Sequence, residues 1–163
     1  MEWYKNDELF KKELREGHRW QLIVAEHLKI HGLSTHVPIL PFRKSISENY
    51  KFRDVPDIVC KKKIIEVKSR RLKFTGPNDY PYRTVHIDTT DGWDGKKNKP
   101  HAFVCVSTIT GYMIALSSTT CHKWTKVTVH DRIRDIDVEF YECHISLWKP
   151  MDCLIEALLK TDE

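Results

Sequence analysis

Two carboxylates and a lysine stand in the chain at a spacing that suits phosphate chemistry. Asp57 follows a proline, and Glu66 and Lys68 lie further on in the run IIEVKS. Alternate side chains of a strand project from the same face of a sheet, so Glu66 and Lys68 would lie side by side. A neighbouring strand that carries Asp57 would bring the second carboxylate within reach. Two converging carboxylates repel each other unless a cation lies between them, and Mg²⁺ or Mn²⁺ suits a site of oxygen ligands.

Metal-dependent hydrolysis of a phosphodiester is the reaction that these three side chains could perform. A divalent ion stabilises charge on the phosphate, while Lys68 orients or deprotonates the attacking water or neutralises the phosphate. The plainer interpretation is an exposed Glu–Lys pair on an edge strand, with Asp57 as a turn residue. Two observations argue against it. The spacing suits two neighbouring strands, and the flanking pairs Ile58-Val59 and Ile64-Ile65 are β-branched, as in a core hairpin.

A long amphipathic helix is predicted before the motif. Apolar residues recur at helical spacing between about Asp7 and His31, and Gly32 ends the segment. Gln21 lies near the centre of the apolar stripe, where an unpaired amide would cost about 1–3 kcal/mol. Gln21 must therefore have a polar partner. His18, one turn earlier, is either a histidine of the core or its rim, or a catalytic base.

The remaining elements follow from alternation and from turn residues. Strands are predicted at 33–38, 55–60, 64–69, 84–88, 102–108, 111–116, 126–129 and 139–145, and a terminal helix at 151–159. Polar segments predict loops at 43–53, 74–82 and 89–100. This order predicts one α/β or α+β domain, residues 1–163, built on a mixed central β-sheet flanked by helices.

The first half of the chain resembles a known superfamily. The segments GHRWQLIVAEHLKIHGL and VPDIVCKKKIIEVKSRR together resemble the PD-(D/E)xK nucleases, which include type II restriction endonucleases, archaeal Holliday-junction resolvases and many phage nucleases. The resemblance covers roughly residues 10–71, and it implies a restriction-endonuclease-like fold with the α-β-β core order.

The resemblance also implies roles for particular residues. Asp57 and Glu66 would bind Mg²⁺, with Mn²⁺ able to substitute, and the Val67 carbonyl would be a further ligand. Lys68 would be the catalytic lysine. The first helix of this superfamily commonly supplies an acidic or amide residue near the metal, and Gln21 stands there in this chain instead of glutamate.

Polar and aromatic residues after the motif are candidates for contacts with DNA. Arginine and lysine bind phosphates, and exposed aromatic rings stack on bases. A solvated strand end and a self-packed loop are the plainer interpretations. The candidate DNA-binding residues are Ser69, Arg70, Arg71, Lys73 and Tyr82.

These observations predict a metal-dependent endonuclease that hydrolyses DNA. A chain of 163 residues leaves little room for a separate specificity domain, which favours recognition of DNA shape or action with a partner protein. The resemblance implies that a homodimer is a further option. The alternative is a catalytically inactive nucleic-acid-binding or assembly module with the same fold, in which Gln21 would be the first sign of decay. A zinc protein that uses Cys121-His122 and Cys143-His144 is disfavoured, because adjacent strand residues point to opposite faces.

Composition and charge are compatible with this function. The net charge of +4 permits a nucleic-acid partner but does not require one. Residues 1–12 are charged and lack the apolar region of a signal peptide, and five widely spaced cysteines are typical of reduced thiols. We therefore expect a cytoplasmic protein without a membrane segment, and a phage or mobile-element origin would suit so compact a nuclease.

Overall fold

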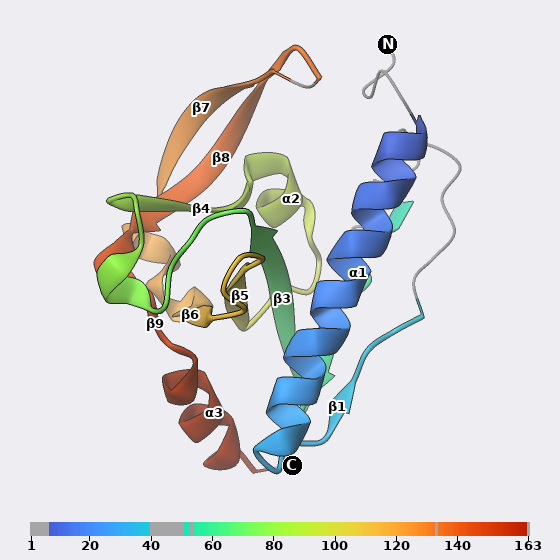
Figure 1. Cartoon of the computed structure of the whole chain (residues 1–163), viewed down its shortest axis with the longest axis vertical. Helices are drawn as coiled ribbons and strands as arrows, with labels where there is room; N and C mark the ends of the chain where they lie inside the picture. The colour runs from blue at the N-terminus through green and yellow to red at the C-terminus, as the bar shows by residue number, and fades with distance from the viewer. Residues whose placement is uncertain (1–6, 40–50, 53, 133, 163) are drawn as a thin grey trace.

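The computed structural model describes residues 7–39, 51–52, 54–132 and 134–162. Within these residues lie two β-sheets and three α-helices (Figure 1). The central sheet has the strand order β1-β2-β3-β5-β6-β9, and only β3 and β5 pair in parallel. Its strands are β1 (Thr35–His36), β2 (Ile58–Cys60), β3 (Lys63–Arg70), β5 (Ala102–Ser107), β6 (Met113–Ser117) and β9 (Lys149–Pro150). The protein is therefore an α/β protein with a mixed six-stranded sheet.

A smaller antiparallel sheet lies beside the central one, with the order β4-β8-β7. Its strands are β4 (Thr84–Thr89), β7 (Thr125–Asp131) and β8 (Ile136–His144). In Figure 1 the β7–β8 hairpin extends away from the rest of the molecule. The helices are α1 (Asp7–Ile30), α2 (Thr90–Gly95) and α3 (Met151–Leu159), and short 3-10 turns occupy Pro77–Asp79, Ser118–Lys123 and Ile145–Leu147.

The central sheet has a core on each face, as the alternation along β5 demonstrates. Val104 and Val106 pack with α1 and α3 on one side, while Phe103 and Cys105 pack on the other side with β4, Trp124 and Trp148. Every residue of β5 is buried. A strand covered on both faces reads as a continuous apolar run, which is why AFVCVS shows no polar alternation.

The C-terminal end of α1 is fixed by a glycine in the left-handed region. Gly32 has φ 87°, and its N–H donates to the Lys29 carbonyl at 2.9 Å. The Leu33 N–H donates to the Leu28 carbonyl at 3.1 Å, and both leucines are buried. This arrangement ends the helix and turns the chain into β1, one residue from the predicted end of the helix.

The β2–β3 hairpin turns on two lysines instead of on glycine. Lys61 and Lys62 have φ values of 48° and 62°, and Cys60 pairs directly with Lys63. Positive φ at both central residues matches the type I′ turn that suits hairpin twist, although each non-glycine residue there costs roughly 1–2 kcal/mol. The strands predicted at 55–60 and 64–69 leave three lysines for the turn, but the turn has two, because Lys63 belongs to β3.

Several other predictions are confirmed and two are wrong. The terminal helix and the β5–β6 hairpin lie where they were predicted. Residues 89–100, predicted as a loop, contain α2, whose N-terminus is capped by the Thr89 hydroxyl accepting from the Gly92 N–H at 2.9 Å. The runs at 126–129 and 139–145 were expected to complete the central sheet, but they pair in the second sheet because their alternating pattern needs only one covered face.

The polar loop predicted at 43–53 falls almost entirely outside the described residues. Among the residues that the structure describes, no helix is both long enough and apolar enough to cross a membrane.

Candidate active site

Asp57 stands directly before β2 and is held by two donors from different elements. The Gln21 amide on α1 donates to Oδ1 at 3.0 Å, and the Val67 N–H on β3 donates to Oδ2 at 2.8 Å. His18 Nδ1 lies 3.1 Å from Gln21 Oε1, so the two helix residues form one chain of hydrogen bonds to Asp57. Gln21 thereby has the partner that its place on the apolar stripe requires. The three elements together fix the direction of the carboxylate.

Glu66 and Lys68 project from the same face of β3, as their spacing predicts. Ile65 and Val67 pack into the core beneath α1, so the charged pair faces the side of the second sheet. The Lys68 ammonium lies 2.5 Å from Glu66 Oε1. Glu66 is only 9% exposed, so this pair is largely withdrawn from water. Its charges are therefore screened much less than those of a surface pair.

Two further residues complete the cluster, and neither was predicted from the sequence. Asp88, on β4, lies 3.4 Å from Lys68 through Oδ1 and 2.9 Å from Lys96 through Oδ2. Lys96 follows α2 and also reaches Glu66 Oε2 at 3.1 Å. Glu66 and Asp88 therefore alternate with two lysines around a ring of four charges.

The charge of the site does not cancel when Asp57 is counted with the ring. Three carboxylates stand against two ammonium groups, which leaves one negative charge when all are ionised. Burial, followed by the neighbouring charge of Glu66, raises the pKa of Asp57 from 3.8 to about 7. Asp57 is thus the carboxylate that the ring leaves uncompensated.

Two of the ring residues, Asp88 and Lys68, are held in their charged forms by their neighbours. Burial would raise the pKa of Asp88, but the ammonium groups of Lys68 and Lys96 outweigh it and hold the pKa below its usual value. Burial would likewise lower the pKa of Lys68, yet the carboxylates of Glu66 and Asp88 outweigh it and raise the pKa. Without a bound cation, Lys68 is a hydrogen-bond donor and a positive charge, not a proton acceptor.

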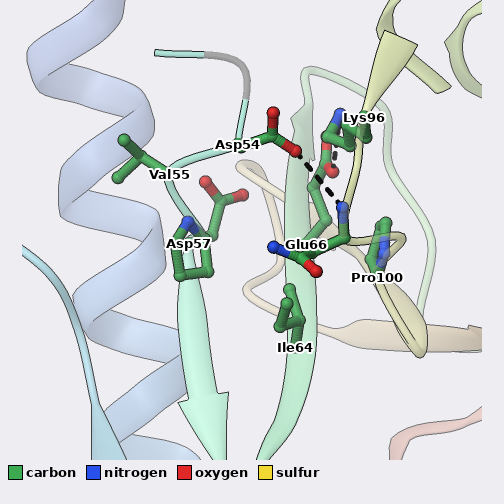
Figure 2. A pocket seen from close by; sticks show the side chains of 9 residues that line it. Asp54, Val55, Asp57, Ile64, Glu66, Lys96 and Pro100 are labelled. Carbon is green, nitrogen blue, oxygen red and sulfur yellow. Dashed lines mark hydrogen bonds and ion pairs between the residues drawn. The ribbon is translucent and has the colours of Figure 1, made fainter. Parts of the chain in front are cut away.

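A pocket lies beside the ring of charges, and Asp57, Glu66 and Lys96 are among the residues that line it. Figure 2 shows Asp57 at the entry to β2, Glu66 reaching in from β3, and Lys96 beside it. Asp54 ties the segment before β2 to the loop after α2, because its Oδ1 accepts from the Lys97 N–H at 2.8 Å. The pocket is thus bounded by the two sides of the β2–β3 hairpin and by the segment after α2, which is distant from them in the sequence.

The carboxylate oxygens at this pocket suit Mg²⁺, which needs few side-chain ligands, better than a metal ion that is bound by three or more side chains. Within the parts of the chain that the structure describes, no three His, Cys, Asp or Glu side chains form a metal cluster. Mg²⁺ is commonly bound by one or two carboxylates and keeps several waters, so Asp57 and Glu66 are the side chains that would hold such an ion. The N–H and C=O of one strand residue face the same side, so the Val67 carbonyl faces the edge where its N–H meets Asp57.

The proposed DNA-contacting residues lie beyond the cluster, at the end of β3 and after it. Arg70 is on the same face as Glu66 and Lys68, half-buried, with its guanidinium donating to the Ser69 carbonyl at 3.2 Å. Arg71 and Lys73 are exposed. Tyr82 is 60% exposed and lies against Tyr80, with ring centroids 6.4 Å apart.

The cysteine–histidine pairs show no sign of chelation. Cys121 and His122 are exposed on a 3-10 turn, not on the strand that the sequence argument assumed. Cys143 is buried, whereas the adjacent His144 is exposed and accepts from the Ser146 N–H at 3.1 Å.

The structure therefore brings together Gln21, Asp57, Glu66 and Lys68, with His18 linked to them through Gln21. A bulge between His86 and Asp88 turns Asp88 inward, and nothing in the sequence signals that shift. In comparisons with protein-family models, with curated proteins and with solved structures, nothing matched this chain.

Proposed function

We propose that this protein is a Mg²⁺-dependent nuclease of the PD-(D/E)xK, restriction-endonuclease-like class that hydrolyses phosphodiester bonds in DNA. One observation carries the proposal. Asp57 and Glu66 face the same pocket with Lys68 beside them, and three carboxylates stand there against two ammonium groups. Burial and the charge of Glu66 raise the pKa of Asp57, and a divalent cation at these carboxylates would offset both by stabilising the ionised form.

Each residue has a definite role in this proposal. Asp57 and Glu66 hold the cation, which when bound polarises the phosphate and makes water a better nucleophile. Lys68 donates hydrogen bonds to the attacking water and stabilises the negative charge that develops on the phosphate. Gln21 and the Val67 N–H keep Asp57 pointed at the pocket, so the carboxylate does not have to reorganise when the cation arrives.

The distribution of basic residues supports a nucleic-acid substrate. Lys96 lines the pocket and is followed in the chain by Lys97 and Lys99, while Arg70 ends the strand that carries Lys68 and Arg71 follows it. Phosphate contacts position a duplex without reading its sequence. Because these residues would contact DNA phosphates and not bases, recognition of DNA shape or action beside a partner protein fits better than recognition of a long DNA sequence.

One observation favours the non-catalytic alternative. Both oxygens of Glu66 are paired with lysines, and so are both oxygens of Asp88. Such a ring also links β3, β4 and the segment after α2, as a structural charge network would. The alternative is therefore a binding module that keeps the fold and does not cut.

A cleavage assay separates these functions. Supercoiled plasmid, linear duplex, single strand and four-way junction are each incubated with Mg²⁺, Mn²⁺ or EDTA. We expect metal-dependent cutting by the wild type and at least a hundredfold loss in Lys68→Ala, as removal of one group that stabilises transition-state charge costs about 10²–10³ in rate. Lys160→Ala, an exposed lysine at the end of α3, should cut like the wild type. DNA binding without cutting under every condition would instead support the inactive module.

A further inference from the structure

Lys96 would compete with a bound cation for the carboxylate of Glu66. Its ammonium lies 3.1 Å from Glu66 Oε2 and 2.9 Å from Asp88 Oδ2, and its side chain is only 12% exposed. It also lines the pocket shared by Asp57 and Glu66 (Figure 2). Because Lys68 already holds Glu66 Oε1, both oxygens of the expected ligand are engaged by positive groups. A divalent ion that approaches Glu66 therefore meets the charge of Lys96.

The backbone around Lys96 is held in place while its side chain is long and unbranched. The Lys96 N–H caps α2 by donating to the Trp93 carbonyl at 3.3 Å. Next along the chain, the Lys97 and Asn98 N–H groups both donate to Asp54, at 2.8 and 3.3 Å. The Lys99 ammonium donates to the carbonyls of Trp93 and Lys96. The ammonium of Lys96 can thus leave Glu66 by rotation of its side chain, without movement of the loop.

A DNA phosphate at the edge of the pocket would give the displaced ammonium an anionic partner. Lys96 begins the basic run KKNK, and Lys97 in that run is exposed. A DNA strand whose phosphate enters the pocket would present its oxygens at this edge, where an ammonium binds phosphate as a point charge. Asp88 would remain paired with Lys68 after Lys96 departs.

We propose that Lys96 is a further catalytic residue, which holds the cation's place on Glu66 in the free protein and moves to the DNA phosphate when the ion binds. This inference rests on the proposed function. Binding of the metal ion and binding of DNA should then be cooperative, because each favours the state in which Lys96 has left Glu66. A coupling of this kind is reciprocal. The free protein should then bind divalent ions weakly, and the DNA complex should bind them more tightly.

The first test measures binding of Mn²⁺ alone by calorimetry, in wild type and in Lys96→Met, which keeps the length of the side chain and removes its charge. We expect Lys96→Met to bind Mn²⁺ about tenfold more tightly in the absence of DNA, the effect of removing one nearby positive charge. Lys97→Met is the matched control, because it removes a charge from the same run and leaves Glu66 untouched. An unchanged or weaker Mn²⁺ affinity in Lys96→Met would overturn the inference.

The second test measures binding of uncut duplex in Ca²⁺ over a range of salt concentrations. If Lys96 contacts a phosphate, Lys96→Met should bind the duplex more weakly than the wild type does. The slope of log affinity against log salt concentration should also be smaller by about one. A merely structural ion pair predicts instead that Lys96→Met melts at a lower temperature and that Mn²⁺ does not restore it. Lys96→Gln repeats both tests if the methionine variant does not fold. A wild type that neither binds Mn²⁺ nor cuts DNA contradicts the proposed function, whereas a cutting wild type with unchanged Mn²⁺ affinity in Lys96→Met contradicts only this inference.

Discussion

Replacing Asp57 by asparagine should stabilise the metal-free protein at alkaline pH and lose that advantage in acid. Burial and the charge of Glu66 raise the pKa of this carboxyl from 3.8 to about 7. The native state therefore binds a proton that the unfolded chain has lost, and its stability falls as the pH rises from about 4 to about 7. Above that range the cost is constant, and asparagine, which carries no charge, escapes it.

The size of the effect follows from the two pKa values. Each pKa unit corresponds to about 1.4 kcal/mol. The loss of stability linked to Asp57 is then about 2 kcal/mol near pH 5 and about 4 kcal/mol near pH 8.5, so the pH-dependent gain of Asp57→Asn is roughly 2–3 kcal/mol. Asparagine has one acceptor oxygen for the two donors, Gln21 and the Val67 N–H, and an unpaired donor costs about 1–3 kcal/mol at every pH.

The assay is urea denaturation in EDTA at both pH values, with Glu26→Gln as the control for an exposed carboxylate on α1. We expect Asp57→Asn to gain roughly 2–3 kcal/mol relative to wild type between the two conditions, and Glu26→Gln to gain nothing. A stability difference between Asp57→Asn and wild type that is the same at both pH values would refute the description of Asp57 as a carboxyl whose pKa is raised by burial and by Glu66.

Three further outcomes are expected. Lys62→Gly should raise the free energy of unfolding by about 1 kcal/mol because φ at this exposed turn position is 62°, whereas Lys62→Ala should change it little; chemical denaturation compares the two. Ser107→Ala should destabilise by roughly 1–3 kcal/mol in the same assay, since the buried Oγ donates to the Leu72 carbonyl and accepts from the Ile109 and Thr110 N–H groups. Gln21→Glu should lower the melting temperature in EDTA, because it places a carboxylate against Asp57, and Mg²⁺ should reverse that loss; a loss that Mg²⁺ leaves unchanged would argue against an ion at Asp57.

The part of the site built on local periodicity was predictable from the sequence. Alternation along β3 puts Glu66 and Lys68 on one face and Ile65 on the other, and the structure has this arrangement. The helical stripe of α1 likewise marked Gln21 as a polar residue that needed a partner. The identity of that partner, Asp57, follows only from how α1 crosses the β2–β3 hairpin, which is a tertiary fact.

The other half of the site depends on long-range packing that leaves no local signal. Asp88 faces the cluster because the pairing of β4 with β8 shifts register after His86. Without the bulge, period-two alternation would place Asp88 on the same face as His86. Lys96 reaches Glu66 because α2 folds back on β4, and the helix itself was predicted as a loop, since TDGWDG is rich in turn residues and only six residues long.

The assignment of strands to sheets was also beyond the sequence pattern. The runs in β7 and β8 predict strands, but alternation says only that each has one covered face. Trp124 and Cys143 pack in the core between the two sheets. Their burial there places β7 and β8 in the second sheet and not in the central one. Such tertiary contacts, and not the residues of the strand itself, determine which neighbouring strand it pairs with.

The most direct test of the central claim is Mg²⁺-dependent relaxation of supercoiled plasmid by wild type and by Glu66→Gln, measured side by side with folded protein. Glutamine keeps the size of the side chain and its reach into the pocket, but it removes the charge that would hold the cation between β3 and Asp57. The proposed function predicts that the wild type nicks the plasmid with Mg²⁺ and not with EDTA, and that Glu66→Gln is inactive. A wild type that leaves the plasmid intact, or a Glu66→Gln variant that cuts as fast as the wild type, would contradict it.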